Sequence, residues 1–125
     1  VAARENACAA ARSGDYGPRE VTIRINASGT QWHDDDLAAA CAAGPDGIVV
    51  PKVDSAQEVL DLVAAMERHG ALAHTRLWAM VETPRAVLAV GEIADASPGS
   101  QPWSSGRTTS SRSSARATFP GGRRC

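Results

Sequence analysis

Charged side chains lie within or directly after three short apolar segments of this chain. Arg24 lies in an alternating, β-branched segment, Lys52 follows a continuous apolar run, and Glu82 follows a third apolar run. The guanidinium of an arginine suits a carboxylate, to which it donates two parallel hydrogen bonds. The carboxylate of a glutamate suits a hard divalent cation such as Mg²⁺, which needs further oxygen ligands as well. These residue types predict a site for an anionic ligand together with a metal ion.

Each of these side chains also has an interpretation without a ligand. An arginine on a buried strand is costly unless an anion meets it, and for Arg24 that anion is either a ligand's carboxylate or Glu82. Glu82 in turn has Arg24 and the nearby Arg85 as alternative partners. Lys52 has the position of a Schiff-base lysine, but a contact to a phosphate or carboxylate, or a surface position, is favoured. The ion pair and the ligand site both stay open.

The segments that carry these residues indicate strands alternating with helices. Strands are predicted over 20–26, 47–53 and 76–82, from β-branched alternation and continuous apolar runs. Helices are predicted before, between and after them, over 1–13, 34–43, 55–69 and 85–96. Ser55 and Glu58 have the spacing of a capping box, and Val59, Leu62, Val63 and Met66 fall on one helix face. The run His33-Asp34-Asp35-Asp36 resembles a metal site, but a solvated helix N-terminus is the favoured interpretation.

Alternating strands and helices favour an α/β fold of parallel βα units with right-handed crossovers. Three such units resemble part of a Rossmann-type sheet or about half of a TIM (β/α)8 barrel, which needs roughly 200–250 residues. The chain has no GxGxxG or P-loop motif, which weakens a nucleotide-binding interpretation. Both architectures collect function at the carboxyl ends of their strands. Arg24 and Glu82 should therefore converge at one end of the sheet, with Lys52 on the strand between them. Because half of the barrel is absent, the apolar side chains of Ile48 and Leu77 should lack the residues of the other strands that would pack against them.

Composition divides the chain near residue 97. Residues 98–125 hold five of the 13 basic residues, none of the 14 acidic ones, and many Ser and Gly. We expect residues 1–97 to form the partial barrel and residues 98–125 to be a disordered tail. Five scattered arginines are weak grounds for nucleic-acid binding. No apolar run is long enough to span a membrane. With no secretory signal, and with Cys8 and Cys41 read as buried free thiols, a cytoplasmic location is expected.

The strand-end segments together resemble one enzyme family. VTIRINASGTQWHDDDL, GPDGIVVPKVDSAQEV and WAMVETPRAVLAVGEIA are similar, in this order, to the Arg-x-Asn, Pro-Lys-Val and Glu-Thr-Pro-Arg segments of the HpcH/HpaI aldolase or citrate lyase β-subunit-like CoA-ester lyases. The opening AARENACAAARSGDYG is similar to the helix between that family's second and third strands. The resemblance therefore covers about residues 1–96.

The resemblance implies a (β/α)8 barrel that cleaves or forms a carbon–carbon bond in a carboxylate-bearing acyl-CoA of the citryl-CoA or malyl-CoA type. It implies that Arg24 binds substrate and takes part in catalysis, and that Glu82 binds Mg²⁺ and substrate. Full-length relatives are expected to be homo-oligomers acting on an acyl-CoA or a small dicarboxylate. A 2-oxo acid class II aldolase of the same superfamily is an alternative, and so is an inert or oligomer-forming fragment.

One expected part of the family pattern is missing. The second Mg²⁺ ligand of the family is an Asp in a Gly-x-x-Asp-Leu segment on the next strand, but no acidic residue follows Asp95. A one-nucleotide shift of reading frame near residues 96–98 would permit Val-Val-Gly-Thr-Asn-Asp-Leu in place of residues 104–110. We therefore expect a truncated, inactive chain whose tail is out of frame, through a frameshifted gene or a sequencing error.

Overall fold

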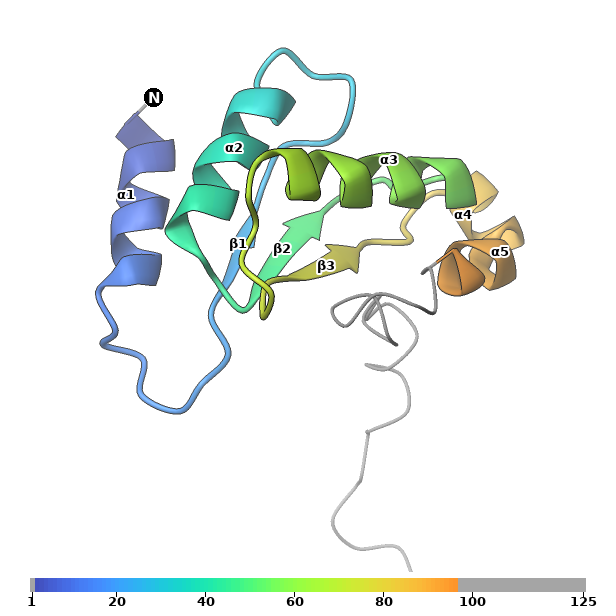
Figure 1. The fold of residues 1–125 in the computed structure, drawn as a ribbon. Coiled ribbons are helices and arrows are strands. Elements are labelled where there is room, and N and C mark those ends of the chain that lie inside the picture. The colour runs from blue at the N-terminus through green and yellow to red at the C-terminus, as the bar shows by residue number, and fades with distance from the viewer. Residues whose placement is uncertain (1, 97–125) are drawn as a thin grey trace, which may run out of the picture.

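Strands and helices alternate along the chain, as the sequence patterns predict (Figure 1). The structure is a computed structural model that describes residues 2–96, so the expectations for the tail at 98–125 lie outside the described residues. The elements, in chain order, are α1 (Ala2–Arg12), β1 (Thr22–Arg24), α2 (His33–Ala43), β2 (Gly47–Val50), α3 (Ala56–Arg68), β3 (Arg76–Ala79), α4 (Pro84–Leu88) and α5 (Val90–Asp95). Each strand is shorter than predicted, because backbone pairing covers only part of each apolar run.

The three strands form one parallel sheet in the order β1-β2-β3. In the register of this sheet, Arg24 lies opposite Val49, and Val49 lies opposite Trp78. Consecutive strands are therefore neighbours with the same direction, joined by the α2 and α3 crossovers. The prediction of an α/β fold built from adjacent parallel βα units is confirmed.

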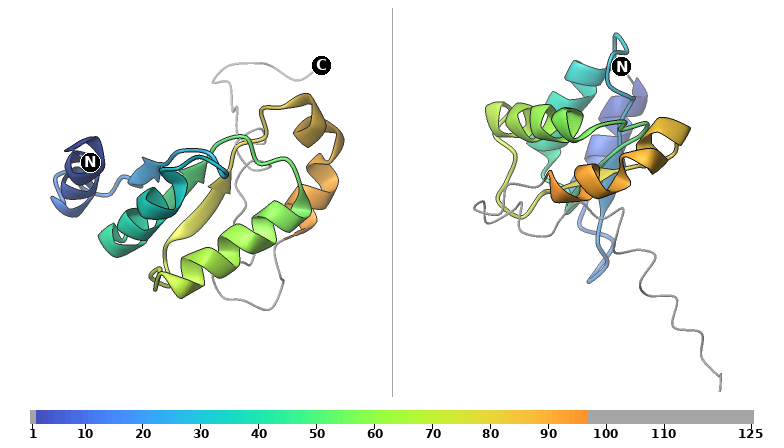
Figure 2. Two further views of the ribbon diagram at one scale, coloured as in Figure 1. Left: turned by 90° about the horizontal axis from the view of Figure 1, so that it is seen from above. Right: turned by 90° about the vertical axis from the view of Figure 1, so that its right-hand side faces the viewer.

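Helices α2 and α3 cover one face of the sheet, and α1 lies beside α2 beyond the free edge of β1 (Figure 2). Helices α4 and α5 follow β3, and α5 contacts α3. The prediction of a single helix over 85–96 is wrong, because the chain turns at Ala89 and forms two shorter helices, α4 and α5. This turn allows Ile93 to be fully buried while Leu88 stays 90% exposed.

The covered face of the sheet holds the hydrophobic core. Ile48, Val50 and Leu77 are buried there with the apolar stripe of α3, which includes Val59 and Met66. The expectation that Ile48 and Leu77 would lack a facing layer is wrong. Successive side chains of a strand point to opposite faces, and the helices of this chain cover the face on which these residues lie.

The other face of the sheet carries the alternate side chains. Thr22 and Arg24 are exposed on it, and Val49 and Trp78 are half-buried. Arg24 is therefore not on a strand buried on both sides within the described part of the chain. Its charge stays in contact with solvent, so burial does not by itself demand a partner.

Local capping signals are largely confirmed. The Ser55 hydroxyl accepts the Glu58 N–H at 3.2 Å, as the capping box predicts. The Glu58 carboxylate, however, accepts the N–H of Asp54 at 2.9 Å, one residue before the cap. Gly44 ends α2 with a φ of 66°, a conformation that glycine adopts without steric cost.

Two further expectations concern the cysteines and the membrane. Cys8 and Cys41 are buried free thiols, as predicted, and burial raises the pKa of the Cys41 thiol to about 11. Of the helices that the structure describes, none has the length and apolar character needed to cross a bilayer.

Candidate functional site

A pocket of about 390 Å³ lies where the three strands end. Its lining includes Arg24 and Asn26 from the end of β1, Lys52 from the segment after β2, and Glu82 from the segment after β3. Parallel strands bring their carboxyl ends to one edge of the sheet, which explains why residues 58 positions apart in sequence share this pocket. The prediction that Arg24 and Glu82 converge at one end of the sheet is confirmed, and Lys52 lines the same pocket.

Arg24 and Glu82 enter the pocket without neutralising each other. Both residues are exposed. Within residues 2–96, neither forms an ion pair within 4.0 Å, and the same holds for Arg85. The internal ion pairs weighed as alternatives for Arg24 and Glu82 are therefore not formed in this structure. The guanidinium and the carboxylate are both available to a ligand.

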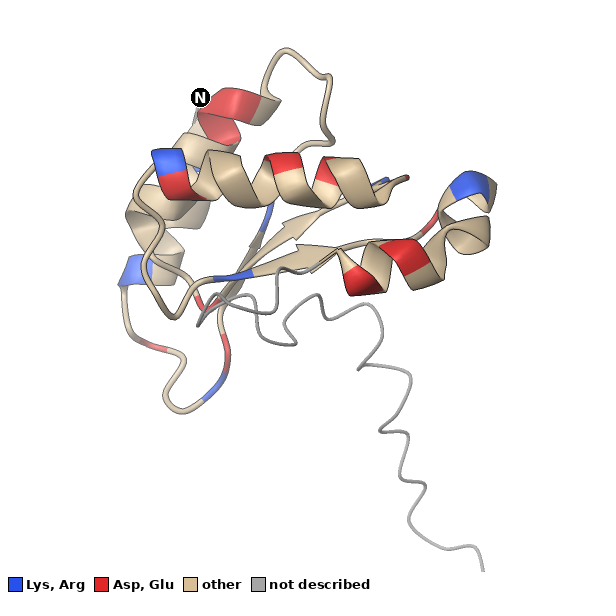
Figure 3. Cartoon of the chain, turned by 45° about the vertical axis from the view of Figure 1, so that its right-hand side comes forward, with Lys and Arg blue, Asp and Glu red and all other residues tan. Residues whose placement is uncertain are grey.

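Charge is unevenly distributed over the molecule (Figure 3). Most acidic residues lie on the helices, including the first turn of α2, whereas the strands carry arginines, Arg24 and Arg76, and no acidic residue. The pocket itself is lined by two cations, Arg24 and Lys52, and by one carboxylate, Glu82. The pocket therefore has one positive charge in excess, which suits an anionic ligand.

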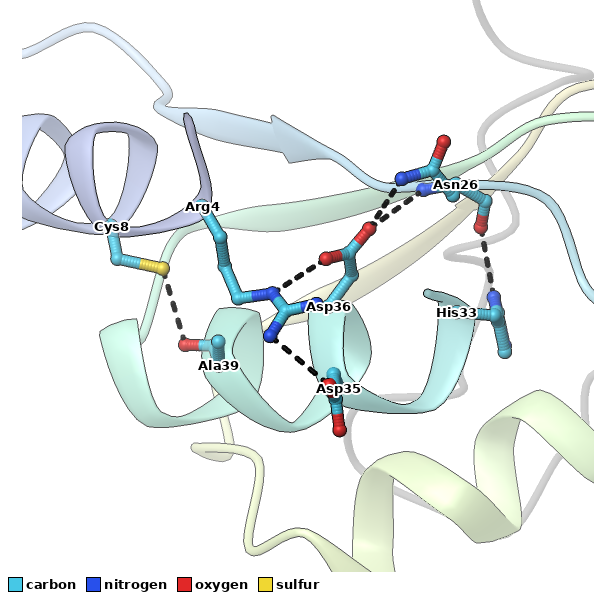
Figure 4. A network of polar contacts seen from close by, with 7 residues as sticks. All are labelled: Arg4, Cys8, Asn26, His33, Asp35, Asp36 and Ala39. Atoms are coloured by element: carbon cyan, nitrogen blue, oxygen red, sulfur yellow. Dashed lines mark hydrogen bonds and ion pairs between the residues drawn. The ribbon is translucent and has the colours of Figure 1, made fainter. Parts of the chain in front are cut away.

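A polar network behind the pocket holds Asn26 in place (Figure 4). The Asp36 carboxylate accepts hydrogen bonds from the Asn26 side-chain amide at 2.6 Å and from Arg4 Nε at 2.7 Å. Arg4 also pairs with Asp35 at 3.2 Å, and the His33 ring lies 2.8 Å from the Asn26 carbonyl oxygen through Nδ1. The network joins α1, α2 and the end of β1, and sequence reasoning missed it because Arg4 and Asp36 are 32 residues apart.

The electrostatics of Asp36 follow from this network. Burial acts to raise the pKa of Asp36, but the hydrogen bonds from Asn26 and Arg4 together lower it by more. The pKa therefore lies below its ordinary value of 3.8. Asp36 is therefore an ionised acceptor at neutral pH. It accepts from one of the two N–H groups of Asn26 Nδ2, so the Asn26 amide keeps its oxygen and its second N–H for other partners.

A second polar contact joins the segments after β2 and β3. The Thr83 hydroxyl donates a short hydrogen bond to the Asp54 carboxylate and accepts the N–H of Ala86 at 3.1 Å. Thr83 thereby caps α4 and ties the residue next to Glu82 to the residue two after Lys52. The two loops that carry Lys52 and Glu82 are held in a fixed relation.

The donors of the pocket fit a divalent cation in part. Glu82 is the one carboxylate among the described residues that line it, and no group of three His, Cys, Asp or Glu side chains in residues 2–96 is arranged to hold a metal. Mg²⁺ is commonly bound by one or two carboxylates, with substrate oxygens and water completing its shell. An exposed, unpaired Glu82 fits the role of one such ligand.

Comparison with known proteins decides the family. The HpcH/HpaI aldolase/citrate lyase family model matches residues 1–101. The chain belongs to this family. Within the HpcH/HpaI family, a (3S)-malyl-CoA thioesterase from Cereibacter sphaeroides is 40% identical over an alignment of 83 residues, and the match covers 64% of this chain and 26% of that protein. Citrate lyase subunit beta from Escherichia coli is 34% identical over an alignment of 87 residues, and the match covers 66% of this chain and 29% of that protein.

The HpcH/HpaI assignment agrees with the fold. The crystal structure of RipC from Yersinia pestis superposes with a TM-score of 0.59 at 30% sequence identity, over 78% of this chain and 40% of that one. The chain thus spans well under half the length of the relatives that it matches.

Proposed function

We propose that this chain forms about half of a (β/α)8 barrel and carries one side of the active site of a CoA-ester lyase. The observation that supports this most directly is the shared pocket of Arg24 and Glu82, at the carboxyl edge of a parallel sheet, with neither group neutralised. The names of the relatives point to malyl-CoA and citrate chemistry. The substrate class that fits is an acyl-CoA bearing a carboxylate, or a small dicarboxylate.

The free edge of β1 supports the barrel. Helix α1 precedes β1 and packs beside α2, as the helix of a preceding βα unit would. Two pockets of about 400 and 380 Å³ follow the side of β1 next to α1, and they share Ala7, Ile23 and Arg24 in their linings. A further parallel strand at this edge would fill the space beneath α1. We propose that such a strand pairs with β1 in the complete barrel.

Arg24 has the role of holding the substrate. Its guanidinium donates to the carboxylate or acyl oxygens and orients the reacting bond, which makes it both a substrate-binding and a catalytic residue. Glu82 would hold Mg²⁺ beside the bound substrate. The metal, when bound, supplies a Lewis acid that polarises a carbonyl. The excess positive charge of the pocket favours the anionic form of the substrate over its neutral analogue.

The missing second carboxylate argues for an inactive chain. No acidic residue follows Asp95 in the sequence, so Glu82 alone would hold the ion, which would keep mostly water around it and bind weakly. The second candidate function is therefore a non-catalytic or oligomer-forming fragment.

The proposal has three further parts. The complete enzyme is a homo-oligomer, it is located in the cytoplasm, and residues 98–125 originate from an out-of-frame reading.

Two measurements test the proposed function. Titration of the 125-residue chain with Mg²⁺ should show weak binding that is lost in Glu82→Gln and kept in Glu92→Gln, a matched change on α5 outside the pocket. Acyl-CoA cleavage should be absent in this chain and present when the alternative reading frame after residue 96 is restored. Cleavage by the 125-residue chain that depends on Glu82 would show that the site needs no second carboxylate. Equal Mg²⁺ binding in both variants would show that Glu82 is not a ligand of the metal.

A further inference from the structure

Lys52 lies in an irregularity of the sheet. The Met80 N–H donates to the Val50 carbonyl at 2.9 Å, and the Met80 carbonyl accepts the N–H of Val53 at 3.2 Å. In a regular parallel ladder the second of these bonds would come from Lys52, two residues after Val50. The segment therefore contains one extra residue between these two hydrogen bonds. Such a bulge re-aims a side chain.

The backbone at Lys52 confirms that the extra residue is accommodated there. Lys52 has a φ of 59°, the only positive φ among the described residues other than glycine. A lysine gains nothing sterically from this left-handed conformation, which costs free energy for any residue with a Cβ atom. Its neighbours Pro51 and Val53 are both buried and hold the bulge from either side. The surrounding packing imposes the conformation on Lys52.

The consequence of the bulge is the direction of the lysine side chain. In a regular strand, residue 52 would point to the same face as Ile48 and Val50, which are fully buried beneath the helices. With the extra residue, Val53 takes that buried position with 0% exposure, and Lys52 is exposed and lines the pocket with Arg24 and Glu82. The strained backbone at Lys52 thus places a second cation, beside Arg24, in the lining of the pocket.

That cation has no partner of its own. Within residues 2–96, Lys52 forms no ion pair within 4.0 Å, and Glu82 is the only carboxylate in the lining. A strained residue whose charge is unneutralised and turned into a cleft is a typical feature of a binding position.

We propose that Lys52 is a substrate-binding residue that holds a second carboxylate of the ligand, beside the group held by Arg24. This inference rests on the proposed function and deepens it, since it assigns the pocket to ligands with two anionic groups rather than one. Two cations on adjacent strand ends offer separate contacts to the two ends of a short dicarboxylate. Lys52 would then set the preference for dicarboxylate over monocarboxylate ligands.

The test uses the full 125-residue chain with Mg²⁺ present and three probes: succinate, butyrate of the same carbon number, and inorganic phosphate. Lys52→Met removes the charge and keeps the length of the side chain. Lys52→Gly removes the side chain and relieves the positive φ. Arg68→Met removes an exposed cation at the end of α3, outside the pocket, and serves as the matched control. Calorimetry gives affinity, and thermal unfolding of each variant gives stability.

The expected result separates binding from structure. Succinate affinity should fall about tenfold or more in both Lys52 variants, as for a lost charge-assisted hydrogen bond, while butyrate affinity changes less than about twofold. Lys52→Gly should at the same time raise the unfolding temperature, because glycine accepts the left-handed backbone. A lysine with only a structural role would lose stability and affinity together. Arg68→Met should leave succinate binding at the wild-type value.

The contrary outcomes are distinct. Succinate binding by the wild-type chain that is unchanged in both Lys52 variants would overturn the Lys52 assignment and leave the proposed function standing. Lys52-dependent binding of phosphate, with succinate unaffected, would overturn the assignment to a carboxylate. Failure of the wild-type chain to bind either succinate or Mg²⁺ would overturn the proposed function and this inference with it.

Discussion

The Asp36 carboxylate accepts a 2.6 Å hydrogen bond from the side-chain amide of Asn26, so the first turn of α2 orients a residue that lines the pocket. The same carboxylate receives the Arg4 guanidinium from α1. The arrangement links the outermost helix of the described chain to the strand end at which Arg24 lies. The position of the pocket residues on β1 therefore depends on an ion pair outside the pocket.

This link predicts a pH-dependent loss of stability. The pKa of folded Asp36 lies below its ordinary value of 3.8, so the contribution of its ionised form is present above that value and is lost as the pH falls through the lower folded pKa. Asp36→Asn should cost about 2 kcal/mol of unfolding free energy at pH 7, and the cost should shrink below about pH 4. Urea unfolding at several pH values measures both effects. Asp34→Asn on the same turn is the control, and a cost that grows toward low pH would contradict the prediction.

A second prediction concerns the contact between Gly47 and Trp78. A Cβ atom at Gly47 would lie 2.6 Å from Trp78 Nε1 and 3.2 Å from Thr22 Cγ2, so the indole must move if Gly47 becomes alanine. Gly47→Ala should cost about 1–3 kcal/mol, as for other overpacked positions, and should change the tryptophan fluorescence. Gly91→Ala in α5 has open space around its Cβ position and should be neutral or stabilising. Equal unfolding free energies for the two variants would count against the packing described here.

A third prediction tests the covered face of the sheet. Met66 on α3 is fully buried, whereas Leu88 on α4 is 90% exposed. Met66→Ala should destabilise the chain by about 2–5 kcal/mol through lost burial and a residual cavity. Leu88→Ala should change stability by less than about 0.5 kcal/mol. Chemical denaturation of both variants gives the comparison, and a small cost at Met66 would show that the helix layer is loosely packed.

A fourth prediction concerns the tie between the loops after β2 and β3. Thr83→Ala removes the hydroxyl that caps α4 and binds Asp54. It should cost about 1 kcal/mol of stability and weaken Mg²⁺ binding through Glu82, because the loop beside Glu82 is no longer held. Thr83→Ser keeps the hydroxyl and should restore both properties. If Thr83→Ser is as defective as Thr83→Ala, the methyl group rather than the hydroxyl is responsible.

Local patterns in the sequence determined the order and direction of the elements. Apolar runs at 47–53 and 76–82, separated by a helix with Ser55 and Glu58 at its start, imply adjacent parallel strands, because a helical crossover returns the chain to the same end of the sheet. From that direction it follows that Arg24 and Glu82 meet at one edge. The site was predictable because it depends on strand direction, which local patterning sets.

Only the tertiary structure decided which face of the sheet is covered and how the pocket is supported. Alternation divides a strand into two faces but does not state which one receives the helices, and so the burial expected for Arg24 was wrong. The contact of Arg4 with Asp36 and the bulge at Lys52 depend on chain segments far apart in sequence. Such contacts form when packing of α1 and β3 fixes their neighbours, and no local pattern encodes that packing.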